Sequence, residues 1–317
     1  MQTAGRPAAW KTLLAFGIIY FVWGSTFLAI RVSVLEIPPF LCAALRFTMA
    51  GALLYAWMRL TGTAAPKRQE WGSAALLGTV IFALDYGCVF WAEQRVPSGI
   101  TAVVLATIPA FITLLEVAML RTQRLTLRLG AALLVGMGGV AVLMNNSLAL
   151  GEQPIDRKGA LALLVAAFAW ALGTIMSRKL ALPGSKPMSA AAQMLAGGVQ
   201  LFLVAAAAGE FSRFHARAVS PQAWAALAYL IVAGSIVAFT AYIWLLHYFS
   251  PTKVGTYAYV NPVVAVAIGY LLGGESIGLR TLLGTLLVLV SVVGITTMKT
   301  AARENVARKR VELAAAD

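Results

Sequence analysis

The 317-residue sequence is 60% hydrophobic and only 12% charged, whereas a soluble domain carries about 25% charged residues. One soluble core cannot bury that much apolar surface, so we expect a membrane protein. The formal net charge of +13 does not indicate a nucleic-acid-binding protein, because the basic residues are scattered through short segments and form no basic face.

Ten long apolar segments, separated by charged residues, follow one another along the chain. Each is close to the ~20 residues with which an α-helix crosses ~30 Å of hydrocarbon. Lipid-facing strands would leave backbone groups unpaired, so we predict an all-α integral membrane protein with ten transmembrane helices. The first segment is too long for a cleavable signal and is expected to stay in place. The predicted spans are residues 12–30, 39–59, 71–91, 98–120, 128–146, 159–177, 188–208, 222–247, 254–273 and 281–298.

The second half of the chain is a diverged copy of the first. We therefore predict one five-span repeat over residues 1–150 and another over 151–317, which ends in a short basic tail. Because five is odd, two such repeats are inverted in a membrane, as in many secondary transporters. Offsets of 147 and 153 residues align Trp23 with Trp170, Arg31 with Arg178, Gly51 with Gly198, Trp91 with Trp244, and Pro109 with Pro262.

The distribution of lysine and arginine predicts the orientation of the spans. With the amino terminus in the cytoplasm, the inner segments hold 17 of these residues and the outer loops hold 7. The positive-inside rule therefore places both termini in the cytoplasm, here of a bacterial inner membrane.

Three charged residues lie inside predicted spans away from the end residues, where each needs a partner or a water-filled cavity. Arg46 and Asp85 lie at similar depths, about 10 Å from the same face, which predicts an ion pair or a shared water network. The alternative is a pair that only fixes helix packing. We expect the Glu116 carboxylate to pair with Arg121 and Arg124. The alternative is that Asp85 or Glu116 carries a proton during transport.

Two repeat-related tryptophans and two repeat-related prolines lie near the middle of their spans. The indoles of Trp23 and Trp170 need hydrogen-bond acceptors there, supplied by a solute cavity or by a neighbouring helix. Pro109 and Pro262 predict helix kinks, which either expose backbone oxygen to a solute or only aid packing. The expected substrate-binding residues are Trp23, Arg46, Asp85, Tyr86, Thr107, Trp170, Phe239, Tyr257 and Asn261.

Small residues in two spans predict close helix packing, either within the scaffold or at a dimer contact. They are Gly136, Gly138 and Gly139 in the fifth span and Gly284, Ser291 and Gly294 in the tenth.

Signatures of enzymes are missing from the sequence: it has no H-E-x-x-H, no G-x-S-x-G and no paired carboxylates on one helix. We therefore expect neither catalysis, nor a cofactor, nor a bound metal. A phosphate-binding loop is absent as well, so we expect no ATPase subunit. Cys42 and Cys88 lie inside apolar spans without metal-ligand spacing.

Several short motifs, each weak alone, together resemble the EamA-type branch of the drug/metabolite transporter superfamily over nearly the whole chain. They are Trp23-Gly24-Ser25-Thr26-Phe27, Arg46-Phe47, Val96-Pro97-Ser98-Gly99, Ala106-Thr107-Ile108-Pro109, the run from Tyr257 to Val266 and Gly274-Glu275. The nearest resemblance is to YedA-like and YddG-like bacterial inner-membrane exporters. It implies a basket in which helices 1–4 and 6–9 surround a central cavity while helices 5 and 10 support it.

The expected function is that of an inner-membrane secondary transporter exporting amino acids or related small metabolites by alternating access. The alternative is efflux of drugs and aromatic compounds by proton antiport, with a passive channel and an intramembrane enzyme as further rivals. The expected partners are a small-molecule substrate and the lipid bilayer, for a monomer or a homodimer.

Overall fold

The structure is a computed structural model that describes residues 8–120, 126–145, 154–249, 254 and 256–314. These residues form helices and connecting segments, and the expected all-α membrane class is confirmed. Eight helices are long and apolar enough to span a membrane: Ala9–Val34, Pro39–Leu60, Arg68–Glu93, Ser98–Met119, Leu127–Met144, Arg157–Ser177, Lys186–Ala207 and Pro221–Leu245. Two shorter apolar helices follow, Tyr257–Gly273 and Leu279–Ile295.

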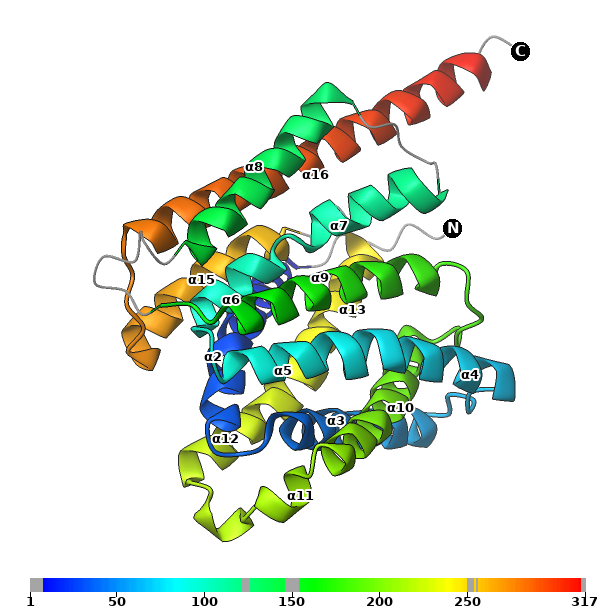
Figure 1. Ribbon diagram of the computed structural model, residues 1–317. Helices are drawn as coiled ribbons and strands as arrows, with labels where there is room; N and C mark the ends of the chain where they lie inside the picture. The colour runs from blue at the N-terminus through cyan, green and yellow to red at the C-terminus, as the bar shows by residue number, and fades with distance from the viewer. Residues whose placement is uncertain (1–7, 121–125, 146–153, 250–253, 255, 315–317) are drawn as a thin grey trace.

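Four of these spans are built from more than one helical segment, and Figure 1 shows their course. The first contains α1 (Ala9–Gly17), the π-helix η1 (Ile18–Val22) and α2 (Trp23–Val34); the third contains α4 (Arg68–Leu77), the π-helix η2 (Gly78–Tyr86) and α5 (Gly87–Glu93); the fourth contains α6 (Ser98–Leu105), α7 (Ile108–Leu115) and the π-helix η3 (Glu116–Leu120); and the eighth contains α12 (Pro221–Tyr229), the π-helix η6 (Leu230–Val237) and α13 (Ala238–Tyr248).

The remaining spans are single helices. They are α3 (Pro39–Leu60), α8 (Leu127–Met144), α9 (Arg157–Ser177), α10 (Lys186–Ala207), α15 (Tyr257–Gly273) and α16 (Leu279–Ala314), and the short helices α11 (Glu210–Arg213) and η5 (Ala216–Ala218) join α10 to α12.

Local sequence signals set the ends of several helices. The Asp156 carboxylate accepts the Gly159 N–H at 3.0 Å and caps α9, and the Ser220 hydroxyl caps α12 by accepting the Ala223 N–H at 3.2 Å. Gly274 ends α15 in the left-handed conformation, at φ 64°. These caps explain why the boundaries lie within a few residues of those that charges predict.

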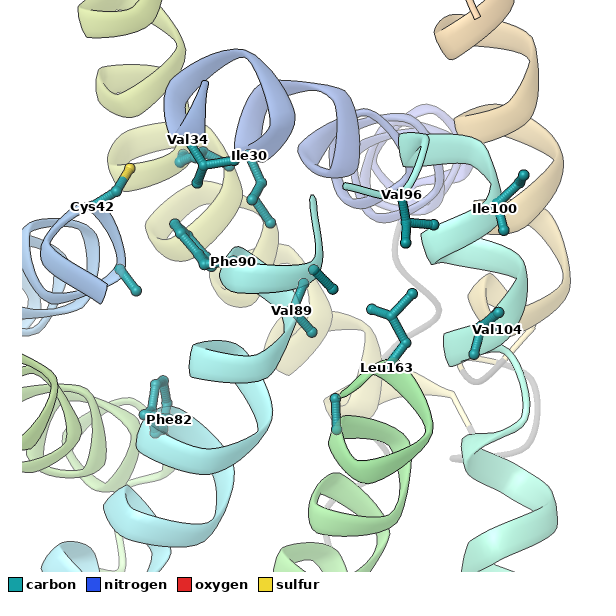
Figure 2. Packing of buried hydrophobic residues seen from close by; sticks show 14 of the residues in the cluster. Ile30, Val34, Cys42, Phe82, Val89, Phe90, Val96, Ile100, Val104 and Leu163 are labelled. Atoms are coloured by element: carbon teal, nitrogen blue, oxygen red, sulfur yellow. The ribbon is translucent and has the colours of Figure 1, made fainter. Parts of the chain in front are cut away.

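The largest apolar core joins the two halves of the chain. Ile30 of α2, Phe82 of η2 and Phe90 of α5 are buried in the same cluster as Leu163 of α9, and Figure 2 shows these side chains lying between the helices. Each buried side chain of this size contributes ~1.5–3 kcal/mol in a soluble protein, but between helices in lipid the gain comes mainly from dispersion and close fit.

Helices α3 and α10 pack closely because glycine removes side chains from their contact. A Cβ atom on Gly51 would lie 2.9 Å from the Leu195 backbone nitrogen. A Cβ atom on Gly198 would lie 2.8 Å from the Thr48 backbone nitrogen. The two contacts are reciprocal, because the 147-residue offset converts one pair of positions into the other.

Helices α8 and α16 form a second close pair, side by side in Figure 1. A Cβ atom on Gly139 would lie 2.9 Å from the Val288 backbone nitrogen, and Gly136 faces the Ser291 side chain. The Ser291 hydroxyl donates to the Ala132 carbonyl at 2.6 Å. Gly136 and Gly139 of the fifth span therefore pack against Gly284 and Ser291 of the tenth within one chain, as the sequence predicts for a scaffold, whereas Gly138 makes no such contact. Helix α16 continues to Ala314, beyond the predicted end of its span at residue 298.

Candidate functional site

Arg46 of α3 is buried among aromatic rings. Its guanidinium carbon lies 4.8 Å from the ring centre of Phe47, 5.4 Å from that of Tyr86 and 5.9 Å from that of Phe90. Its Nε donates to the Ser235 hydroxyl at 3.1 Å, while its buried Nη1 has no hydrogen-bond partner among the described residues. Arg46 thus offers an unused cationic donor inside an aromatic enclosure.

Asp85 is also buried, but the described residues include no ion pair between it and Arg46. The expected direct pair is therefore wrong for this structure. Asp85 and Tyr86 are consecutive residues of η2, so their side chains leave the helix in different directions, and Tyr86 is the one whose ring faces Arg46. Equal depth along two spans does not fix the rotation of either helix.

The two predicted midplane tryptophans lie in neighbouring ring clusters. The Trp170 ring meets Tyr86 edge to face at a centroid distance of 6.0 Å. Trp23 contacts Tyr257 at 4.9 Å and Tyr242 at 5.4 Å. Tyr242 and Tyr257 also meet each other edge to face, at a centroid distance of 6.0 Å.

The indole nitrogen of Trp23 donates to the Gly234 carbonyl at 3.1 Å. A neighbouring helix, rather than a solute, therefore satisfies this indole in the present conformation. Gly234 precedes Ser235, the partner of Arg46, so one short stretch of η6 holds both of these predicted site residues.

The other predicted site residues surround these clusters at different distances. The Asn261 amide, oriented to satisfy its neighbours, donates to the carbonyls of Tyr20 and Tyr257 at 3.2 Å each and so joins the Trp23 cluster. The Phe239 ring lies 6.3 Å from that of Tyr242. The buried Thr107 hydroxyl donates to the Val104 carbonyl within its own turn, at 2.7 Å.

The two predicted prolines occupy different settings. Pro109 is the second residue of α7, directly after a break between α6 and α7 at residues 106–107. Pro262 lies inside the continuous helix α15. The backbone interruption is therefore in the first-half copy, where restricted geometry before proline favours a helix end.

Two π-helical stretches, which the sequence pattern does not reveal, flank the site. Segment η2 covers residues 78–86 and η6 covers 230–237, and the 153-residue offset places the two at equivalent positions. A π-helix interrupts the regular i→i−4 bonding, and such interruptions are frequent at functional sites. In η6 the Ser235 hydroxyl donates to the Leu230 carbonyl, five residues back, at 2.9 Å.

Two grooves of the described chain lie outside the ring clusters. One groove, of about 600 Å³, lies between α4 and α10, and another, of about 320 Å³, lies beside residues 34–40 and Gln94. Neither is lined by Trp23, Arg46 or Tyr257.

Glu116 pairs with a residue that the sequence did not suggest. Its carboxylate accepts from Arg178 Nη2 at 2.9 Å, across the two halves. Glu116 is buried, whereas the Arg178 side chain is 46% exposed. The expected partners, Arg121 and Arg124, lie outside the described residues. The Glu116–Arg178 contact does not test proton transfer, so the proton-carrier roles of Asp85 and Glu116 stay predictions.

A second network between the halves was missed because its members lie at the ends of predicted spans. Arg31 Nη1 donates to the carbonyls of Glu93 at 2.9 Å and Val96 at 2.7 Å. Arg31 Nε lies 3.7 Å from Glu275 Oε1. Glu275 in turn accepts the N–H groups of Ser98 at 2.6 Å and Gly99 at 3.0 Å, at the start of α6. The available signals are the repeat match of Arg31 with Arg178 and the motifs that contain Val96, Ser98, Gly99 and Glu275.

Comparison with known families gives a match over both halves. The model of the EamA-like transporter family matches residues 10–145 and again residues 157–297. The chain is 38% identical over 261 residues to the uncharacterised inner membrane transporter YedA of Escherichia coli K12, and the match covers 82% of each chain.

Two further comparisons agree with this match. The chain is 28% identical over 297 residues to a probable amino-acid metabolite efflux pump of Salmonella typhimurium, covering 90% of this chain and 95% of that protein. A solved crystal structure resembles the fold with a TM-score of 0.62 at 21% identity, covering 90% of this chain and 96% of that one.

Proposed function

The chain belongs to the EamA-like transporter family, and on that premise we propose that it is an inner-membrane secondary transporter that exports amino acids or related small metabolites by alternating access. Family membership makes it a membrane transporter. The substrate class, the direction of transport and the mechanism are the proposal.

Inverted repeats supply the proposed mechanism, with residues 1–150 and 151–317 rocking about the site between them. The separate family matches of the two halves support this division. So do the reciprocal contacts of Gly51 with Leu195 and of Gly198 with Thr48, because a two-fold axis between α3 and α10 produces such pairs. The 17-to-7 bias of basic residues supports cytoplasmic termini.

The observation that carries the substrate class is the buried guanidinium of Arg46 with an unpartnered Nη1. An arginine in this setting binds a carboxylate through charge-assisted hydrogen bonds. The surrounding rings of Phe47, Tyr86 and Trp170 suit an apolar or aromatic side chain and can also face an ammonium group. One carboxylate beside an apolar body describes an amino acid better than a phosphorylated sugar, which requires several cations.

The ring clusters also favour a second candidate, efflux of aromatic or drug-like compounds by proton antiport. In that case the rings of Trp23, Tyr242 and Tyr257 bind the compound by stacking. Arg46 then serves the packing of α3 against η6 and contacts no solute.

Counterflow in proteoliposomes that contain the purified full chain distinguishes the two candidates. The solutes are radiolabelled amino acids, their decarboxylated amines, and ethidium as an aromatic cation. We expect amino acids to exchange and amines to fail. Losing a charge-assisted hydrogen bond costs about 1.5–3 kcal/mol, so Arg46→Gln should weaken apparent affinity about 10- to 100-fold.

The matched control is Arg95→Gln, which removes another arginine that stacks on a ring, that of Trp91, but is well exposed. It should leave exchange unchanged. Equal exchange of amino acids and amines, with Arg46→Gln behaving like the control, would contradict the carboxylate site. Ethidium exchange under those conditions would support the antiport candidate.

A further inference from the structure

The Glu93 side chain, at the last residue of α5, is buried without any donor facing it. The residue is 0% exposed, and neither carboxyl oxygen has a hydrogen-bond partner among the described residues. An ionised carboxylate presents about four acceptor sites. Burying one without donors costs far more than burying a neutral acid, so such a group takes up a proton.

The neighbours of Glu93 show why no donor reaches it. Arg31 donates to the backbone carbonyls of Glu93 and Val96 and lies against Glu275. Glu275 accepts two N–H groups and faces Arg31. Arg31 therefore lies beside Glu93 and joins it to Glu275 in one small site. Two carboxyls in one small site do not both ionise readily, and Glu275 holds all of the stabilising contacts.

Other charged groups lie on the elements packed against α5, and Glu93 must be considered against all of them. Helices α2, α3, α6, α9 and segment η2 contact α5. Their charged residues, with those of the adjoining loops, are Arg31, Glu36, Arg46, Arg59, Lys67, Asp85, Arg95, Asp156, Arg157, Lys158, Arg178 and Lys179. Glu275, which follows α15, also reaches the start of α6. Of these, Arg31 donates to the Glu93 backbone and contacts Glu275, so the Arg31–Glu275 contact sets the position of the cation beside Glu93.

We propose that Glu93 is a proton-binding site of this transporter, loaded while Arg31 contacts Glu275 and emptied when that contact opens. The inference rests on the proposed alternating access, because Arg31 and Glu275 belong to opposite repeats and rocking would part them. Once released from Glu275, Arg31 can turn from the Glu93 backbone carbonyl, which it contacts now, to the side-chain carboxylate of the same residue. The proton bound as a carboxylic acid then leaves to solvent, and the new ion pair replaces it.

Infrared difference spectroscopy of the full chain in proteoliposomes, titrated with pH, tests the site without any solute. The protonated carboxyl C=O stretch is the readout. We expect the wild type to show this band at neutral pH and Glu93→Gln to lose one component of it. Glu275→Gln, which keeps Glu93, should free Arg31 and move the loss of the same component to lower pH. Glu36→Gln, at an exposed loop position, should change nothing in this band.

The same spectra test Asp85 as a rival proton carrier. An unchanged band in Glu93→Gln, or a band lost in Asp85→Asn alone, would overturn the proposal. If Glu93→Gln does not fold, Glu275→Gln decides the matter, since an unshifted component in that variant also overturns it. Absence of amino-acid exchange together with a Glu93 band would contradict the proposed substrate class and leave the proton site standing.

Discussion

Replacing Gly198 by alanine should force α3 and α10 apart. The new Cβ would lie 2.8 Å from the Thr48 backbone nitrogen, 0.6 Å short of the 3.4 Å at which ordinary contact begins. The obstacle is backbone, which cannot rotate away as a side chain can. Overpacking of this kind costs about 1–3 kcal/mol.

Gly138→Ala supplies the matched control, because a Cβ at that position of α8 has no other atom within 4 Å. Both substitutions gain the same helix propensity, up to ~1 kcal/mol, so their difference isolates the contact. For a chain of this size, 1 kcal/mol corresponds to about 2 °C in Tm. We therefore expect Gly198→Ala to unfold about 2–6 °C below Gly138→Ala.

Thermal unfolding of the purified full chain in detergent, followed with a thiol-reactive fluorescent dye, gives this difference directly. Cys42 is completely buried and reports global unfolding, whereas Cys88 is half-buried and contributes a baseline. Gly51→Ala should behave like Gly198→Ala, because its contact is the reciprocal one. Equal midpoints for Gly198→Ala and Gly138→Ala would refute the close contact between α3 and α10.

Two further predictions use the same unfolding assay. Arg178→Gln should destabilise the chain by about 1–2 kcal/mol, less than the loss of a fully buried pair, because Arg178 is half-exposed. Glu116→Gln should cost less, since the charge that it leaves unpaired, that of Arg178, is in contact with solvent. A larger loss for Glu116→Gln than for Arg178→Gln would contradict this. Burial raises the pKa of Glu210 in α11, outside the membrane spans, against the opposing effect of its bonds from the Leu41 and Phe40 N–H groups. The folded state therefore binds this proton more tightly than the unfolded state, and stability should fall as pH rises through the folded pKa; Glu210→Gln should flatten that slope, and an unchanged slope would count against the assignment.

Hydropathy and charge locate the membrane spans because both are properties of the sequence itself. The span predicted at residues 159–177 is observed at Arg157–Ser177, with Asp156 as its cap. Small residues likewise predict close packing, since no side chain keeps the backbones of α8 and α16 apart. These features depend on one segment or on one pair of faces.

Partners across the bundle could not be predicted in the same way. Depth matches Arg46 with Asp85, but η2 presents Tyr86 to Arg46 instead, and Ser235 of η6 accepts the Arg46 Nε–H. The predicted span at residues 71–91 leaves Glu93 in a loop, because charged residues mark the span ends, yet Glu93 is completely buried. Such outcomes depend on how several helices pack together, which one sequence does not record.

The close pairing of α8 with α16 has a consequence for biosynthesis. The ribosome must add the 134 residues between Met144 and Leu279 before the partner of α8 exists. At 5–20 residues per second this takes on the order of 10 s. During that interval the groove left by Gly136 and Gly139 must face lipid tails or an insertion chaperone. The nascent chain can therefore mispair at α8 until α16 is inserted.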